Sequence, residues 1–183
     1  MLLFRRGVVV AMAVLGLAAW PARTQDEKPA GAPLVTRGRV QLNLAGAEKI
    51  LAAAKRKAVT MDAKANIAVV DDGGHLLAFA RMDGARPASA YTAQTKAATA
   101  ATFRQETGTL PPKGEPDLLL NLSLQNAAAA SGGKFTTLKG GVPVVVDGQV
   151  VGAVGVGGGS GDQDAEVAKA GVQALLDELR EKK

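Results

Sequence analysis

The chain has 183 residues, which is enough for one folded domain and too few for two of ordinary size. Hydrophobic residues make up 47% and charged residues 21%, which excludes a disordered chain, and the absence of cysteine excludes a disulfide framework. The formal net charge of +5 is mild and only 3% of residues are aromatic, so we expect no nucleic-acid partner.

The first 22 residues have the pattern of a secretory signal peptide. Arg5 and Arg6 form a basic start, and an apolar run over 8–19 leads to small residues that suit cleavage. This run is shorter than the roughly 20 apolar residues of a membrane span. We therefore expect a signal peptide over 1–22, exported by the general secretory or the twin-arginine route, and no membrane attachment after cleavage. A Pro- and Gly-containing flexible linker over 23–40 precedes a single domain over 41–183, which would be periplasmic or secreted.

The first half of the domain predicts a helix, a hairpin and a second helix. A helix over 43–60 begins with a capping asparagine and has apolar residues on one face. A short apolar strand over 67–70 leads into the turn D-D-G-G-H, and the chain returns as a strand over 76–82. The second helix, over 89–103, presents a face of alanines that lets another backbone or a flat ligand approach closely.

The second half predicts a loop over 108–116, a short helix over 117–130 and a C-terminal helix over 162–181 that Asp162 caps. Three strands precede the last helix, over 135–138, 142–146 and 149–156. An Asp-Gly pair joins the last two strands, which is the strongest short hairpin signal. Strands joined by hairpins predict a mainly antiparallel sheet with helices packed on it, so the fold class is α/β of the α+β type.

His75 is the only histidine, which excludes catalytic triads and His-rich metal cages. Its place after a Gly-Gly turn suits a solvent-facing or turn-stabilising residue. One imidazole is also enough to ligate a haem iron, so His75 is the candidate metal ligand. The glycine-rich run over 155–162 lies between a strand and a helix, where it favours a structural turn over an anion site.

Three further residues are candidates for ligand binding. Arg81 would pair with a ligand carboxylate, or with an aspartate at the sheet edge. Met82 would pack on, or ligate, an apolar cofactor. Lys96 lies in the middle of the second helix and points either to solvent or across a pocket toward an anionic group. No pair of carboxylates suited to acid–base catalysis is recognisable.

Four motifs in order resemble the GlcG/HbpS-type haem-binding (haem-degrading domain) family. They are NIAVVDDGGHLLAFARMDGA over 66–85, KAATAATF over 96–103, GGVPVVVDG over 140–148 and VGAVGVGGGSGDQD over 151–164. The resemblance covers about 42–179. It implies a profilin-like or GAF-like fold, assembly into homo-oligomers, and a small-molecule tetrapyrrole ligand, with haem as the cofactor.

The resemblance also bears on the ligand residues. A known member binds haem through a histidine on the first helix, and the helix over 43–60 has none. His75, Met82, Tyr91 and Lys96 then remain as candidates for the axial ligand, and Arg81 and Lys96 would neutralise the propionates.

The sequence is compatible with three functions. The leading hypothesis is an exported haem-binding protein that acts in haem sequestration or redox sensing. The second is an enzyme acting on a small organic acid or on haem, which the lack of an acid–base pair disfavours. The third is a non-enzymatic accessory subunit that works through oligomerisation.

Overall fold

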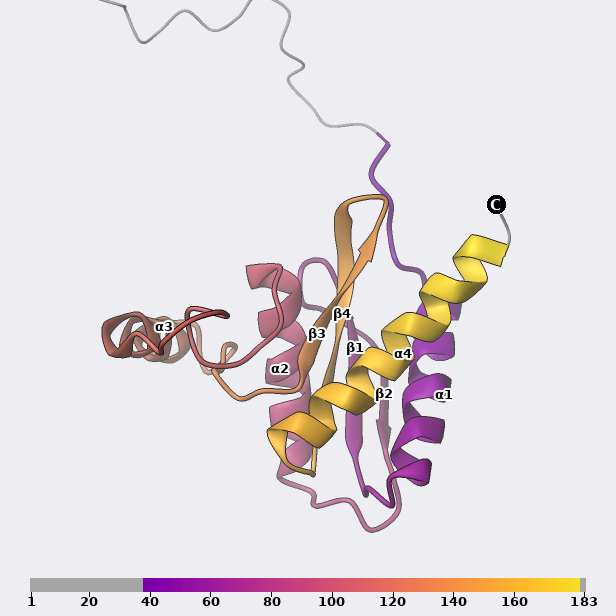
Figure 1. Ribbon diagram of the computed structural model, residues 1–183, viewed down its shortest axis with the longest axis horizontal. Coiled ribbons are helices and arrows are strands. Elements are labelled where there is room, and N and C mark those ends of the chain that lie inside the picture. The colour runs from indigo at the N-terminus through magenta and orange to yellow at the C-terminus, as the bar shows by residue number, and fades with distance from the viewer. Residues whose placement is uncertain (1–37, 182–183) are drawn as a thin grey trace, which may run out of the picture. The chain divides into compact units, whose positions relative to one another are not determined.

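The computed structural model describes residues 38–181, so the predicted signal peptide and most of the predicted linker lie outside the described residues. Four helices and four strands follow one another in the described chain (Figure 1): α1 (Leu44–Thr60), β1 (Asn66–Asp71), β2 (Leu76–Arg81), α2 (Ser89–Phe103), α3 (Leu118–Ala130), β3 (Gly141–Val146), β4 (Gln149–Gly157) and α4 (Gly161–Glu181). None of these helices has the length and apolar character that crossing a membrane requires.

The strands form one antiparallel sheet in the order β2-β1-β4-β3. Helices α1 and α4 pack against each other and cover one face, where alternate β1 residues such as Ile67 and Val69 join the larger core. Helix α2 covers the other face, over β1, β4 and β3, and packs its alanines on Ala68, Val70 and Ala153. The predicted α+β sandwich with an antiparallel sheet is confirmed.

Local sequence signals explain most element boundaries. The Asn43 side chain accepts a hydrogen bond from the Gly46 N–H (2.9 Å) and caps α1, as predicted. Asp147 and Gly148 take positive φ angles of 48° and 75°, the conformation that a two-residue turn between antiparallel strands requires. Pro143 lies in β3, which is an edge strand and therefore tolerates a residue without an N–H.

Two predictions about local structure are wrong. The segment over 135–138 is not a strand, because the Thr136 N–H donates to the hydroxyl of Thr99 on α2 (3.0 Å) instead of joining a sheet ladder. Asp162 is not the cap of α4: Ser160 accepts from the Gln163 N–H (3.3 Å), and Gln163 accepts from the Ser160 N–H (3.0 Å). This reciprocal pair is a capping box, which the sequence S-x-x-Q permits.

Helix α2 approaches β4 closely because Gly155 has no side chain. A Cβ at Gly155 would lie 2.0 Å from the carbonyl oxygen of Ala93 and 2.3 Å from the nitrogen of Ala97, both rigid helix backbone. Gly155→Ala is expected to lower the free energy of unfolding by about 3 kcal/mol, the upper end of the usual cost of overpacking, since the helix must move off the sheet. Urea unfolding followed by circular dichroism measures the change. Gly108→Ala is the control, because no atom lies within 4 Å of its added Cβ; equal losses in the two variants would contradict the argument.

Candidate functional site

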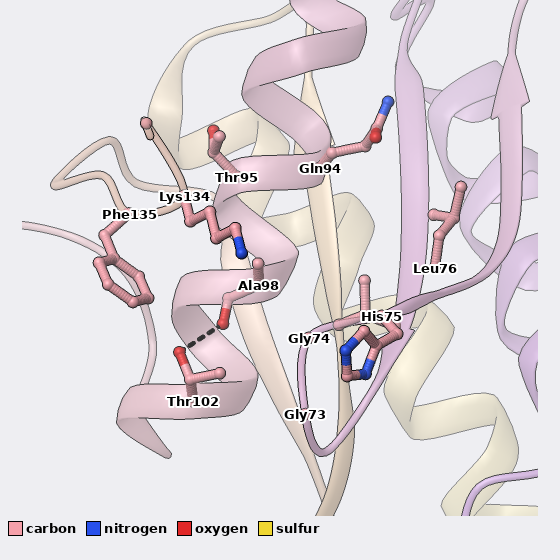
Figure 2. A pocket seen from close by; sticks show the side chains of 12 residues that line it. Gly73, Gly74, His75, Leu76, Gln94, Thr95, Ala98, Thr102, Lys134 and Phe135 are labelled. Atoms are coloured by element: carbon pink, nitrogen blue, oxygen red, sulfur yellow. Dashed lines mark hydrogen bonds between the residues drawn. The ribbon is translucent and has the colours of Figure 1, made fainter. Parts of the chain in front are cut away.

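A largely apolar groove of about 360 Å³ runs along the outer face of α2, and we call it the α2 groove. The β1–β2 turn forms one wall, small α2 side chains form the floor, and the segment after α3 forms the far wall (Figure 2). Its lining residues are Val70, 73–76, Gln94, Thr95, Ala98, Thr102 and 133–135. The volume falls within the range of about 300–1,000 Å³ that small-molecule pockets occupy.

The β1–β2 turn holds His75 at the mouth of this groove. Oδ1 of Asp71 accepts hydrogen bonds from the backbone N–H groups of Gly73 (2.9 Å) and His75 (2.8 Å), which fixes the turn. Nδ1 of His75 lies 3.3 Å from each carboxylate oxygen of Asp71, while 83% of the His75 side chain is exposed. With Nδ1 donating to Asp71, the lone pair of Nε2 is left free to bind a metal or accept a proton.

The floor is narrow because the turn and the helix touch. Gly74 has a φ of +84°, and a Cβ there would lie 3.4 Å from both Cα and Cβ of Ala98. The hydroxyls of Thr95 and Thr102 donate back to carbonyl oxygens of their own helix, at 3.0 Å from Tyr91 O and 2.7 Å from Ala98 O. The floor therefore offers mainly methyl groups to a ligand.

Lys134 and Phe135 form the far wall. The Phe135 ring meets the Phe103 ring edge to face, with centroids 5.2 Å apart, so the wall is tied to the end of α2. The Lys134 side chain extends along the outer face of α2 toward Ala98 in Figure 2. Among residues 38–181, Lys134 makes no side-chain ion pair. The groove thus has an imidazole on one side and an ammonium and a phenyl ring on the other.

Of the five predicted binding residues, only His75 lines the α2 groove. Tyr91 is 76% exposed and lies on the same face of α2, one turn before Thr95. Arg81 is exposed at the end of edge strand β2, and no ion pair of the described residues joins it to Asp71 or Asp83. Met82 packs against the core that α1 and α4 cover, on the other face of the sheet.

Lys96 points into the protein and not toward solvent. Its Nζ donates to Oδ2 of Asp164 (2.7 Å) and to the carbonyl oxygen of Val156 (2.8 Å). The Lys96 and Asp164 side chains are only 5% and 4% exposed. This buried ion pair joins α2, β4 and the first turn of α4, so the Lys96 ammonium is occupied within the core.

The glycine-rich run forms a structural turn, as the sequence favoured. The second oxygen of Asp164, Oδ1, accepts the Gly159 N–H (3.0 Å), and the Gln163 side chain accepts the Ser160 N–H. The carboxylate of Asp164 therefore occupies the position where a bound anion would lie. Nearby, the hydrogen bond and charge of Lys139 lower the pKa of the exposed Asp162 carboxyl from its ordinary value.

Sequence reasoning missed three residues of this arrangement: Asp71 as the partner of His75, Lys134 in the groove, and Asp164 beside Lys96. A carboxylate four residues before the only histidine was a visible signal for Asp71. Lys134 and Asp164 carried no such signal, because each acquires its role from a neighbour distant in the sequence.

Comparisons with known proteins place these features in a family. A family profile described as "Haem degrading protein HbpS-like" matches residues 42–173. Protein GlcG of Escherichia coli is 47% identical over 118 residues, which are 64% of this chain and 82% of GlcG. The crystal structure of a double mutant of HbpS from Streptomyces reticuli is 34% identical, covers 80% of this chain and 99% of its own, and superposes with a TM-score of 0.62. A PduOC:heme complex is similar in fold, with 23% identity, a TM-score of 0.60, and coverage of 74% of this chain and 95% of its own.

Proposed function

The chain belongs to the HbpS-like haem-degrading protein family, and on this premise we propose that it binds haem in the α2 groove with His75 as the axial ligand. The observation that carries the proposal is the His75 imidazole at the groove mouth, with Nδ1 held by Asp71 and Nε2 free. When bound, haem supplies an iron centre that takes an axial nitrogen ligand.

The lining of the groove fits such a ligand. Methyl groups of the α2 floor and the walls of Leu76 and Phe135 suit a flat apolar macrocycle, which they would shield from water. The Lys134 ammonium extends along the outer face of α2 and would pair with a propionate. Lys134 would thus have the role that the family resemblance implied for Lys96, which is buried in its ion pair with Asp164.

Asp71 has a positioning role in this proposal. By accepting a hydrogen bond from the Nδ1–H group it would select the tautomer in which Nε2 is the ligand, and it would raise the electron density that His75 offers to the iron. The two backbone hydrogen bonds of its Oδ1 keep the carboxylate in place while Nε2 binds. This is the outer partner that metal-binding histidines regularly have in proteins.

We further propose that the protein acts after export, in haem sequestration or redox sensing in the periplasm or the medium. The basic and apolar leader over 1–22 supports export, and it lies outside the described residues. A single axial histidine on an exposed turn supports a role in which haem is taken up and released.

Titration of the purified protein with haemin, read by the Soret band, tests the proposal. We expect saturable binding by the unaltered chain and a loss of affinity of at least about tenfold, or roughly 1.4 kcal/mol, in His75→Ala, because the axial bond is removed. Added imidazole is expected to restore the Soret position in His75→Ala, since it replaces the missing ligand. A merely structural role for His75 would give no such rescue.

Two results would overturn the proposal. An unchanged haemin spectrum with the unaltered chain would remove haem binding altogether. An unchanged affinity and Soret position in His75→Ala would retain haem and move the axial ligand to another residue, with Tyr91 as the next to replace because it lies on the same face of α2.

A further inference from the structure

A second hollow, of about 350 Å³, lies at the end of the sheet opposite the α2 groove, and we call it the loop hollow. Three connections meet there, at the lower end of the sheet in Figure 1: the α1–β1 loop, the β2–α2 loop and the β4–α4 loop with the start of α4. Its lining residues are 61–64, Gly84, Arg86, 158–159 and Gln163. It shares none of them with the α2 groove, so the haem proposal gives it no role.

Arg86 is held in place by its neighbours while the end of its side chain stays unpaired. Its Nε donates to the hydroxyl of Ser89 (2.9 Å), a residue that is only 2% exposed. The carbonyl oxygen of Arg86 accepts from Nδ2 of the fully buried Asn66 (3.0 Å), which ties the β2–α2 loop to β1. Within residues 38–181, no hydrogen bond or ion pair involves Nη1 or Nη2 of Arg86. A guanidinium oriented in this way can donate two parallel hydrogen bonds to an oxyanion.

The other two walls of the loop hollow also present donors. Oε1 of Gln163 accepts the Ser160 N–H (3.0 Å), and its Nε2 has no acceptor in the described part of the chain. Lys64 brings an ammonium from the α1–β1 loop. Its ion pair with Asp62 (3.2 Å) is weak because the Asp62 side chain is 94% exposed and water screens the charges. A space lined by an amide N–H, a guanidinium and an ammonium suits an anion.

Glycines bring the three walls close together. A Cβ at Gly158, which has a φ of +141°, would lie 2.5 Å from the carbonyl oxygen of Lys64. Gly84 has a φ of +79°, and a Cβ there would lie 3.7 Å from Cγ of Lys64. Lys64 therefore contacts both of the other loops, which only residues without side chains permit at these backbone angles. One small ligand can then reach donors from all three connections.

The acidic residues at the start of α4 do not oppose an anion. Asp162 pairs with Lys139 and Asp164 pairs with Lys96, so both carboxylates are neutralised by other lysines. Asp164 and Gln163 also accept the N–H groups of Gly159 and Ser160. An anion in the loop hollow would therefore be held by side chains and not by the backbone of the glycine-rich run.

We propose that the loop hollow binds a phosphate group, free or carried by a small molecule, through Arg86, Gln163 and Lys64. A carboxylate has two oxygens in one plane, which the arginine alone satisfies, whereas a tetrahedral phosphate presents oxygens to all three walls. A phosphate group carries about −1.5 to −2 charges at pH 7, which the two cations balance. This site lies apart from His75 and the α2 groove, so it stands or falls independently of haem binding.

Calorimetric titration of the full chain with inorganic phosphate tests the site, in roughly 0.15 M NaCl so that attraction to distant charges is screened. We expect saturable binding by the unaltered chain and at least about tenfold weaker binding by Arg86→Gln, because charge-assisted hydrogen bonds are lost. Arg104→Gln is the matched control, since Arg104 is exposed at the other end of α2, and it should bind as the unaltered chain does. No binding by the unaltered chain, or equal weakening in the two variants, would overturn the proposal.

Gln163→Glu separates binding from folding. The glutamate keeps an oxygen acceptor for the Ser160 N–H, and S-x-x-E is a capping box like S-x-x-Q, so the urea midpoint should not fall. The same change replaces the free amide donor by a carboxylate that repels phosphate, so we expect at least about tenfold weaker binding. Unweakened phosphate binding by Gln163→Glu would refute the site. Tighter binding of malonate than of phosphate by the unaltered chain would refute the choice of phosphate over a carboxylate.

Discussion

Lys96→Met is expected to lower the free energy of unfolding by about 3–5 kcal/mol, the usual cost of removing one partner of a buried ion pair. The Asp164 carboxylate is 4% exposed and, within the described residues, would keep only the hydrogen bond that the Gly159 N–H donates to its Oδ1. The carbonyl oxygen of Val156 would also lose its donor from Lys96. Urea unfolding followed by circular dichroism measures the loss.

Two further variants test whether the loss of stability in Lys96→Met comes from leaving the buried Asp164 charge unpaired. Lys139→Met removes an ammonium from an exposed pair with Asp162 and is expected to change stability little, because solvent screens that pair. The double variant Lys96→Met with Asp164→Leu is expected to recover part of the loss, since no charge is left unpaired in the core. If Lys96→Met were as mild as Lys139→Met, the pair would not be a determinant of the fold.

This ion pair shows where sequence reasoning ends. Lys96 and Asp164 are 68 residues apart in the sequence, and no local feature of either residue indicates that the other is its partner. A lysine in a helix of alanines and threonines is equally suited to solvent or to a pocket, and only the packing of α2 on β4 decides that it points inward. Its predicted role toward a ligand came from its helix position and from the family resemblance, and neither indicates the contact with Asp164.

Local signals, by contrast, predicted much of the fold. The boundaries of α2 follow from its alanine periodicity, and the capping asparagine of α1 and the Asp-Gly turn between β3 and β4 were readable because each acts on its neighbours in sequence. The segment over 135–138 was misread because phenylalanine and threonine are residue types that favour strands. In the structure, the Thr136 N–H of this segment donates to the Thr99 hydroxyl of α2, and no local sequence pattern predicts this tertiary contact.

The residues of the candidate site also fall into those that local sequence predicts and those that depend on tertiary contacts. His75 was identifiable because the chain has one histidine and places it after a tight turn. Lys134 and Phe135 reach the groove because α3 and the loop after it bring them back across α2, close to Phe103. Arg81 is the last residue of β2, and Met82 follows the strand and packs against the core on the other face of the sheet, so neither lines the groove.

Thr95→Trp is expected to weaken haemin binding by about 100-fold or more, equivalent to roughly 2.7 kcal/mol, whichever residue ligates the iron. Thr95 lies on the groove floor, and an indole there would occupy much of the roughly 360 Å³ that the ligand needs. The fold should persist, because the side chain faces the groove and its hydroxyl bonds only to carbonyl oxygens of its own helix. The Soret titration measures the affinity, and circular dichroism checks the fold.

Thr60→Trp is the matched control, since its hydroxyl also donates to its own helix, at the end of α1, and the residue is exposed away from the groove. It is expected to bind haemin as the unaltered chain does. Both variants introduce an indole into a domain whose described residues contain no tryptophan, so quenching by haem gives a second readout. Strong quenching with retained affinity in Thr95→Trp would mean that haem binds beside the groove and not within it. Equal weakening in both variants would place the binding surface elsewhere, because only one of the two substitutions fills the space between His75 and Lys134.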